Sequence, residues 1–359
     1  MKRMKQAVGT FLVISVAAVM PLAGCAKEEA KTIGVSLSSK ELARSLKDEE
    51  YLTKDLSEMG YKVDVQFGQG DANIQASQIE NMIMSGVDGL IISPWDASSM
   101  TKVVEMAHEN NIPVIAYDAN ILNSEYVDYY SADDLLEIGA VQAQYIVDHL
   151  DWSQADSYNL EIVAGDPADS NATYFYNGAL NVLKPFIEDG RLVVQSGQID
   201  FAVTGTPGWD ASKAQARMDT ILSTYYTDKH IDAVLCSNDG VALGVISALK
   251  SVGYGSSDLP LPITTGQDCD AASIKSIIAG EQTMTAFKDI RELAENGAYM
   301  IDCLVKGEEP KIENPVIYNN GVKDVQAMVV EPKALDITNY KELLFDSGYY
   351  SEDILNQAE

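Results

Sequence analysis

The hydrophobic positions of this chain recur in two alternating patterns. Short apolar runs of strand length, such as 32–37 and 89–92, are followed by segments in which apolar residues return every three or four positions. Ile79, Met82 and Ile83, for example, share one face of a predicted helix over 73–85. Regular strand–helix alternation with short loops predicts parallel sheets that are covered by helices on both faces.

The alternation runs through two sets of elements, which are separated by a transition at 126–130. We expect the first set to comprise strands 32–37, 62–67, 89–92 and 114–116 and helices 42–59, 73–85 and 100–110. We expect the second set to comprise helices 134–150, 171–183, 212–226, 240–252 and 271–279 and strands 159–164, 192–197, 233–236, 263–266 and 283–287. A last helix, 291–305, is expected to return to the first set.

The two sets predict an α/β fold of two doubly wound, Rossmann-like lobes that are joined by a hinge of several strands. We assign residues 32–131 and 288–315 to an N-terminal lobe and residues 132–287 and 316–359 to a C-terminal lobe.

The first twenty-five residues have the order of a secretory signal peptide. Basic residues at Lys2, Arg3 and Lys5 precede an apolar run over 7–20, which is shorter than a typical membrane span. The segment ends in Leu22-Ala23-Gly24-Cys25, which resembles the lipobox of bacterial lipoproteins, in which the cysteine is acylated. We therefore predict a signal peptide over 1–24 and a lipid-anchored tether over 25–31, with Cys25 holding the protein to the cell membrane outside the cytoplasm. An ordinary signal peptide with a chance cysteine is the alternative.

Composition excludes several classes of function. The 359 residues carry a formal net charge of −29, which argues against binding to nucleic acid or to anionic lipid headgroups through the protein surface. Beyond Cys25 only Cys236, Cys269 and Cys303 remain, which is no disulfide framework, and whether Cys236 and Cys269 pair stays open. With three histidines and no ligand pair at metal spacing, we expect neither a metal nor a cofactor.

Polar side chains follow the predicted strands at their carboxyl ends, where open α/β sheets bind ligands. The candidates are Asp118, Asp169, Asn171, Asn238, Asp268 and Lys288. Each has a simpler explanation, because Asp and Asn at such positions often cap the following helix, as we expect of Asp270 and Ser212.

This set of side chains matches the needs of a carbohydrate. Carboxylates accept from hydroxyl groups, amides both donate and accept, and a basic side chain donates to ring or hydroxyl oxygens. Trp95 and Trp209 lie in polar loops and are candidates for an aromatic platform against the apolar face of a sugar. Paired carboxylates also serve glycosidases, but neither their spacing nor a nucleophile, phosphate-loop or metalloprotease motif singles out an enzyme.

Seven motifs together resemble the type I periplasmic sugar-binding proteins, in their xylose-binding and multiple-monosaccharide-binding branch. They are Ser77-Gln78-Ile79-Glu80-Asn81-Met82, Ile115-Ala116-Tyr117-Asp118, Val182-Leu183-Lys184-Pro185, Ala214-Gln215-Ala216-Arg217-Met218-Asp219, Ser237-Asn238-Asp239, Thr265-Gly266-Gln267-Asp268 and Asn320-Gly321-Val322-Lys323. The resemblance extends from Thr32 to about Asp353.

The resemblance implies a protein that binds one aldose in the cleft between its lobes, delivers it to an ABC importer and is not an enzyme. By position it implies ligand contacts from Arg44, Asp118, Asp169, Asn171, Trp209, Asn238, Asp268 and Lys288. The chain departs from the family at Ser45 and Ala119, where a tryptophan and an arginine are usual. These departures predict a larger, more acidic first half of the site and a different or larger sugar, or one that stacks on Trp95.

Two alternatives to transport follow from the same resemblance. A sugar-sensing receptor that presents its closed form to a membrane histidine kinase has the same sequence features, so the choice between permease and kinase as partner stays open. A sugar-responsive repressor shares the fold class but requires a helix-turn-helix at the position of this signal peptide. We expect the protein to act as a monomer.

Overall fold

The computed structural model describes residues 30–40, 43–313 and 315–356. The predicted signal peptide, the lipidation site Cys25 and most of the tether lie outside the described residues. Lys31–Glu359 form one compact unit. Within the described part of the chain, no helix is long and apolar enough to cross a membrane.

The first lobe contains a seven-stranded sheet in the order β11-β12-β5-β4-β3-β1-β2, in which β11 alone is antiparallel to its neighbour. Its strands are β1 Thr32–Leu37, β2 Lys62–Phe67, β3 Gly89–Ile92, β4 Val114–Tyr117, β5 Tyr129–Asp133, β11 Val316–Asn319 and β12 Asp324–Val330. Its helices are α1 Ala43–Glu58, α2 Ala72–Met84, α3 Thr101–Glu109 and α10 Ile290–Lys306.

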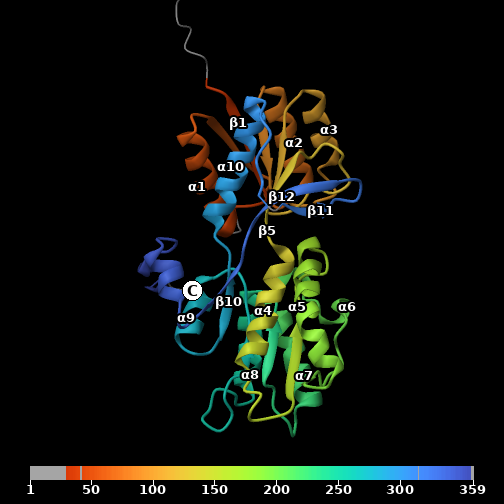
Figure 1. The fold of residues 1–359 in the computed structure, drawn as a ribbon, viewed down its shortest axis with the longest axis vertical. Coiled ribbons are helices and arrows are strands. Elements are labelled where there is room, and N and C mark those ends of the chain that lie inside the picture. Colours follow the sequence, from red (N-terminus) through yellow and green to blue (C-terminus); the bar gives the residue numbers. More distant parts are fainter. Residues whose placement is uncertain (1–29, 41–42, 314, 357–359) are drawn as a thin grey trace, which may run out of the picture. The chain divides into compact units, whose positions relative to one another are not determined.

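Alternate residues of this sheet face two separate apolar cores. Leu90 and Ile92 pack in a core with α2 and α3, whereas Ile91 packs in a core with α1 and α10. This alternation is what a sheet covered by helices on both faces requires. In Figure 1, α10 lies beside α1 although the two helices are far apart in the sequence. The predicted return of the helix at 291–305 to the first set is therefore confirmed.

The second lobe has a four-stranded parallel sheet in the order β7-β6-β8-β9 and an antiparallel pair of β10 with β13. Its strands are β6 Tyr158–Val163, β7 Leu192–Val193, β8 Ala233–Cys236, β9 Ile263–Thr264, β10 Met284–Phe287 and β13 Lys333–Asp336. Its helices and helical turns are α4 Leu135–His149, α5 Ser170–Glu188, α6 Phe201–Thr204, η1 Pro207–Trp209, α7 Ala211–Tyr225, α8 Asp239–Ser251, α9 Ala271–Ile278, η2 Lys341–Asp346 and η3 Glu352–Asn356. Helices α4 and α5 share one apolar core, α7 and α8 share a second, and α9 packs in a third with Phe287 and Leu335 of the β10–β13 pair.

Helices α4 and α5 approach each other closely because glycines replace side chains at their contact. A Cβ atom on Gly139 would lie 1.8 Å from the backbone oxygen of Phe175, and one on Gly178 would lie 1.9 Å from that of Leu136. Both distances are far inside van der Waals contact, so these positions admit only glycine while the helices keep this spacing.

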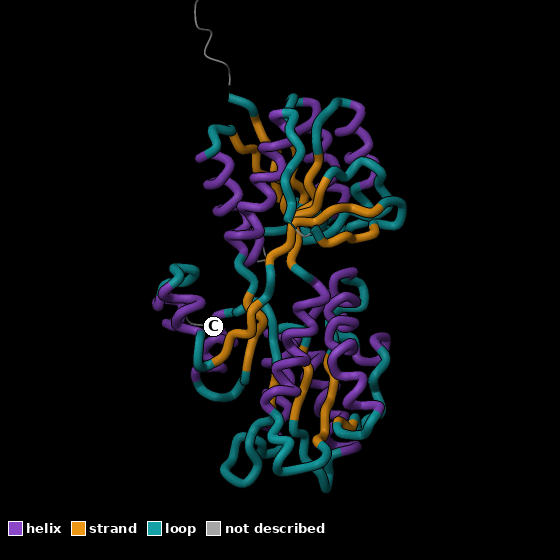
Figure 2. Tube along the Cα trace, in the orientation of Figure 1, coloured by secondary structure: helices purple, strands orange, loops and turns teal. Residues whose placement is uncertain are grey.

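The predicted α/β fold with two Rossmann-like lobes is confirmed, but one assignment to a lobe is wrong. We expected 316–330 in the second lobe, whereas β12 pairs in parallel with β5 and β11 extends the same sheet. The reason is that β5 offers a free edge, which β12 occupies with Val325 and Ala327 buried. The chain therefore passes between the sheets three times, after β5, after β10 and after β12 (Figure 2). The other domain boundaries stay predictions.

Two local expectations also need correction. Asp210, not Ser212, caps α7, because its carboxylate accepts from the backbone N–H groups of Ser212 and Lys213. Asp270 stands at the N-cap position of α9, but its side chain makes no capping hydrogen bond. Cys236, Cys269 and Cys303 are buried free thiols, so the open question of a Cys236–Cys269 disulfide is answered in the negative.

Candidate functional site

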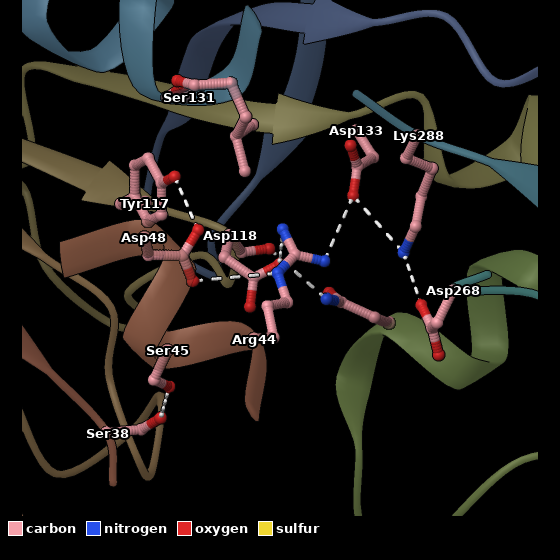
Figure 3. Close-up of polar contacts among 12 residues, drawn as sticks. Ser38, Arg44, Ser45, Asp48, Tyr117, Asp118, Ser131, Asp133, Asp268 and Lys288 are labelled. Carbon is pink, nitrogen blue, oxygen red and sulfur yellow. Dashed lines mark hydrogen bonds and ion pairs between the residues drawn. The ribbon is translucent and has the colours of Figure 1, made fainter. Parts of the chain in front are cut away.

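Arg44 is the centre of an ion network at the carboxyl end of the first sheet (Figure 3). It lies in the first turn of α1, and its Nη2 atom is 2.8 Å from Oδ1 of Asp118. Its other guanidinium nitrogens lie 3.7 Å from Oδ2 of Asp48 and 3.7 Å from Oδ2 of Asp133. One guanidinium thus serves as counter-ion to three carboxylates.

Lys288 continues this network toward the second lobe. Its Nζ atom lies 3.5 Å from Oδ2 of Asp133 and 3.0 Å from Oδ1 of Asp268. Asp133 is therefore shared by Arg44 and Lys288, and charges of opposite sign alternate along the whole series (Figure 3). Asp133 ends β5 and Lys288 follows β10, so the network sits where the chain passes between the sheets.

Burial and the neighbouring charges shift the pKa values of this network in opposite directions. Burial raises the pKa of Asp48 to about 6, despite the opposing effect of Arg44. Burial likewise raises the pKa of Asp118 above its ordinary value. Burial also acts to raise the pKa of Asp268, but the charge and hydrogen bond of Lys288 outweigh it, so that this pKa is lowered. The contact with Lys288 thus favours the charged form of Asp268.

The backbone around Asp118 is held in an unusual conformation. Asp118 has a φ of 62°, in the left-handed region that non-glycine residues rarely adopt. Its carbonyl oxygen accepts a hydrogen bond of 2.7 Å from the Tyr130 hydroxyl and one of 3.3 Å from Nδ2 of Asn171. Beneath it, the Tyr117 hydroxyl donates to Oδ1 of Asp48 at 2.8 Å. These contacts compensate for the strained backbone and aim the Asp118 carboxylate at Arg44.

In the second lobe, Trp209 lies against the end of β6. A Cβ atom on Gly165 would come within 2.0 Å of the indole ring, so the ring packs directly over this glycine. The Trp209 side chain also lies close enough to Asp169 to oppose the rise that burial causes in the pKa of this carboxyl. Asp169 in turn caps α5 by accepting from the backbone N–H of Asn171 at 2.8 Å. The indole is thereby held in a defined orientation with part of its surface exposed.

Two further candidates are held by other contacts. Asn238 caps α8 through a hydrogen bond of 2.9 Å from the N–H of Val241 to its side-chain oxygen. Trp95 is 47% exposed and packs over Gly70, and its backbone N–H donates to the buried side chain of Gln75.

Of the nine predicted residues, the structure joins Arg44, Asp118 and Asn171 in one group and Asp268 and Lys288 in another, and Asp133 links the two groups. Trp209 and Asp169 form a neighbouring pair, while Asn238 and Trp95 are placed by the contacts given above. Sequence reasoning missed Asp48 and Asp133. Asp48 stands four residues after Arg44, which is the spacing of an ion pair on a helix, and Asp133 follows strand residues as the other candidates do.

Comparison with known proteins assigns the class. The model of the periplasmic binding protein domain matches residues 33–309 of this chain. The chain therefore belongs to the periplasmic binding protein domain family, whose members are binding proteins and not enzymes.

Within that family, the chain falls in the branch of multiple-sugar- and xylose-binding proteins. It is 45% identical to the multiple sugar-binding periplasmic receptor ChvE of Rhizobium radiobacter over 90% of this chain and 92% of the relative. It is 35% identical to the D-xylose-binding periplasmic protein of Escherichia coli over 90% of this chain and 92% of the relative. The predicted resemblance is thus confirmed.

A solved structure agrees with both the fold and the class. An ABC transporter solute-binding protein of Clostridium phytofermentans, which holds β-D-glucose, is 45% identical to this chain. The two superpose with a TM-score of 0.82 over 90% of this chain and 100% of the other.

Proposed function

We propose that this chain is a lipid-anchored, extracytoplasmic protein that captures an aldose and delivers it to an ABC importer. The observation that carries the proposal is the ion network, which joins Arg44 and Asp118 of the first lobe to Asp268 of the second through Asp133 and Lys288. The β-D-glucose held by a solute-binding protein 45% identical to this chain supports an aldose as the ligand.

In this proposal the side chains of the ion network and its neighbours make different kinds of contact with the sugar. Arg44 and Lys288 donate to sugar oxygens, whereas Asp118, Asp169 and Asp268 accept from hydroxyl groups. The amides of Asn171 and Asn238 both donate and accept, and the Trp209 indole stacks on the apolar face of the ring. The ligand is a different or larger sugar, or one that stacks on Trp95, as the departures at Ser45 and Ala119 led us to expect.

Binding in such a site favours the closed arrangement of the lobes. A ligand that contacts both lobes only when they are closed shifts the population toward that state by its difference in affinity. The shared counter-ion Asp133 lies at a passage between the sheets, and so it keeps Arg44 and Lys288 close together during such a motion.

Calorimetric titration and thermal-shift measurements with aldoses, ketoses and short oligosaccharides test the proposal. An aldose is expected to raise the melting temperature by mass action. Trp209→Ala and Asp268→Ala are each expected to weaken its binding strongly while the protein stays folded. Unchanged affinity in both variants would exclude these two residues from the site, and failure of every sugar would contradict the proposed function.

The partner and the anchor need separate experiments. Loss of sugar uptake in a deletion strain supports an importer as the partner, whereas intact uptake with loss of a transcriptional response to sugar supports a histidine kinase. Metabolic labelling with a fatty acid, compared between the natural chain and Cys25→Ala, tests the lipid anchor.

A further inference from the structure

The turn that carries Asp268 has an unfavourable backbone conformation. Asp268 and Cys269 have φ values of 98° and 56°, so two consecutive residues other than glycine lie in the left-handed region. Such a conformation persists only where neighbouring groups hold it. The position of the Asp268 carboxylate, which is 34% exposed and pairs with Lys288 (Figure 3), therefore depends on the contacts of this turn.

The second lobe holds the backbone N–H groups of the turn. The N–H of Asp268 donates to the backbone oxygen of Ala286 in β10 at 3.3 Å. The N–H of Cys269 donates to the Thr285 hydroxyl of the same strand, also at 3.3 Å. The next N–H along the chain donates at 2.9 Å to the buried carboxylate of Asp239. These contacts leave the carbonyl of Cys269 to be held by another part of the chain.

Tyr350, near the C-terminus, holds this carbonyl. Its hydroxyl donates to the carbonyl oxygen of Cys269 at 3.2 Å, across 81 positions of the sequence. Its ring packs against the apolar core that contains Cys269, which is 1% exposed. The last turns of the chain, in dark blue, lie beside α9 in Figure 1, and η3 contacts this helix. The end of the chain thus covers the turn that carries Asp268.

The same tyrosine also contacts the first lobe. The Nζ atom of Lys47 in α1 lies 3.8 Å from the centre of the Tyr350 ring and 4.8 Å from that of the Tyr349 ring. A cation at this distance is attracted to the face of an aromatic ring. Lys47 follows Arg44 by three residues, so the two side chains are neighbours on the helix. Tyr350 therefore connects the helix that carries Arg44 with the turn that carries Asp268.

We propose that Tyr350 is a positioning residue of the binding site, which holds the Asp268–Cys269 turn in its binding conformation and fixes it against α1. This inference rests on the proposed function as a sugar-binding protein. Tyr350 acts through Asp268 and not by contact with the sugar. A turn that adopts the binding conformation for only a fraction of the time lowers the apparent affinity by that fraction.

The Cys269 thiol gives a local measurement that needs no sugar. It is buried in the turn, and burial raises its pKa, so both access and thiolate formation are restricted. When the turn opens, the thiol becomes accessible to iodoacetamide. Mass spectrometry of the peptides measures its labelling separately from that of Cys236 and Cys303, which are also buried and report unfolding elsewhere in the protein.

Two substitutions of Tyr350 test the inference. Tyr350→Phe removes only the hydroxyl, whereas Tyr350→Ala removes the ring as well. In both variants we expect faster labelling of Cys269 and unchanged labelling of Cys236, with the larger change in Tyr350→Ala. Calorimetry should show sugar affinity about two- to tenfold lower in Tyr350→Phe, the range that corresponds to one hydrogen bond.

Tyr340→Phe is the matched control. Tyr340 packs against the same apolar core and against the Phe345 ring, so this variant removes a hydroxyl from the same part of the chain. We expect it to change neither the labelling of Cys269 nor the affinity for sugar.

The outcomes separate this inference from the proposed function. Unchanged labelling of Cys269 in both Tyr350 variants overturns the inference, and so do equal changes in Tyr340→Phe and Tyr350→Phe. Faster labelling with unchanged sugar affinity also overturns it, because the turn would then be held without consequence for binding. If Tyr350→Ala exposes all three thiols, the lobes have unfolded and Tyr350→Phe decides. If no sugar binds to the natural protein, the proposed function fails, whereas the labelling still shows whether Tyr350 holds the turn.

Discussion

The two halves of the candidate site use their charged and polar side chains differently. In the first lobe, Arg44 is the shared counter-ion of three carboxylates, to which Tyr117 and Lys288 each add one contact. In the second lobe, Asp169 and Asn238 accept hydrogen bonds from helix N-termini, so that each also stabilises a helix. Losing a partner in a buried ion network costs several kcal/mol, whereas losing a helix cap costs about 1 kcal/mol. Single substitutions in the first half should therefore lower the stability of the protein more than those in the second half.

The largest effect is expected for Arg44→Ala. This change leaves three carboxylates near one another without their shared cation, and we expect unfolding free energy to fall by about 3–5 kcal/mol. Sugar affinity should fall as well. Urea denaturation measures the first effect and calorimetry the second.

Arg191→Ala provides the control for this prediction. Arg191 pairs with Asp189 on the surface, where both side chains are nearly half exposed, and it also lies over the Phe186 ring, so the expected loss is much smaller than that at Arg44. Equal losses in the two variants would show that the Arg44 network contributes no more than a surface pair.

A smaller effect is expected from the titration of Asp48. Its pKa is raised by burial to about 6, so the folded state binds a proton more tightly than the unfolded state does. The contribution of Asp48 to the unfolding free energy is complete below about pH 4 and is lost as the pH rises through 6. A pKa shift of about two units corresponds to a contribution of about 3 kcal/mol.

Asp48→Asn keeps an acceptor for the Tyr117 hydroxyl but does not titrate in this range. Between pH 4 and 7 the natural protein should therefore lose more unfolding free energy than this variant does. Urea denaturation at the two pH values measures the difference, and parallel pH dependences would contradict a raised pKa at Asp48.

The aromatic platform of the second lobe offers a third test. Gly165→Ala places a methyl group within 2.0 Å of the Trp209 ring, so the indole must move although it remains present. Both Trp209→Ala and Gly165→Ala should weaken sugar binding about tenfold, since an aromatic contact and its orientation contribute about 1 kcal/mol or more.

Trp152→Ala is the matched control, because it removes an indole that lies outside the site. Trp152 packs against Tyr158 and Phe186 near the far end of β6. We expect lower stability and unchanged sugar affinity from this variant. A comparable loss of sugar affinity in Trp152→Ala would mean that Trp209→Ala weakens binding by destabilising the second lobe and not by removing a contact with the sugar.

The smallest effects concern the helix caps. Asp169→Ala and Asp210→Ala each remove an N-cap carboxylate, and each should lower stability by less than the loss of Arg44 does. Only Asp169→Ala is expected to reduce sugar affinity as well. If the two variants bind sugar equally well, Asp169 acts as a cap alone.

The sequence predicted most of the strands and helices in order, because the apolar periodicity of each element is a local property, but it did not predict β5, β11, β12 or β13 as strands. It did not predict the place of β12, because Val325 and Ala327 alternate with polar residues equally well in either lobe. Which sheet offers a free edge is decided by the whole fold. The choice of Ser212 over Asp210 as a cap failed for a different reason, since element ends are uncertain by a residue or two.

In the candidate site, too, the residues with a local sequence signal were predicted and those that depend on the folded structure were missed. Strand-end positions indicated Asp118, Asp268 and Lys288, because parallel strands bring their carboxyl ends to one edge. Asp48 was missed because it lies within the charged stretch of α1, where a carboxylate ordinarily faces solvent. Its burial depends on Tyr117, which is distant in the sequence and contacts it only in the folded protein.

The glycine contact between α4 and α5 has a mechanical consequence. The two backbones touch at Gly139 and Gly178, which leaves no side chains between them to slide or repack. Helix α4 begins two residues after Asp133, and the second residue of α5 is Asn171, whose amide donates to the carbonyl of Asp118. The two helices should therefore move as one body, so that a change in direction at Asp133 also changes the position of Asn171.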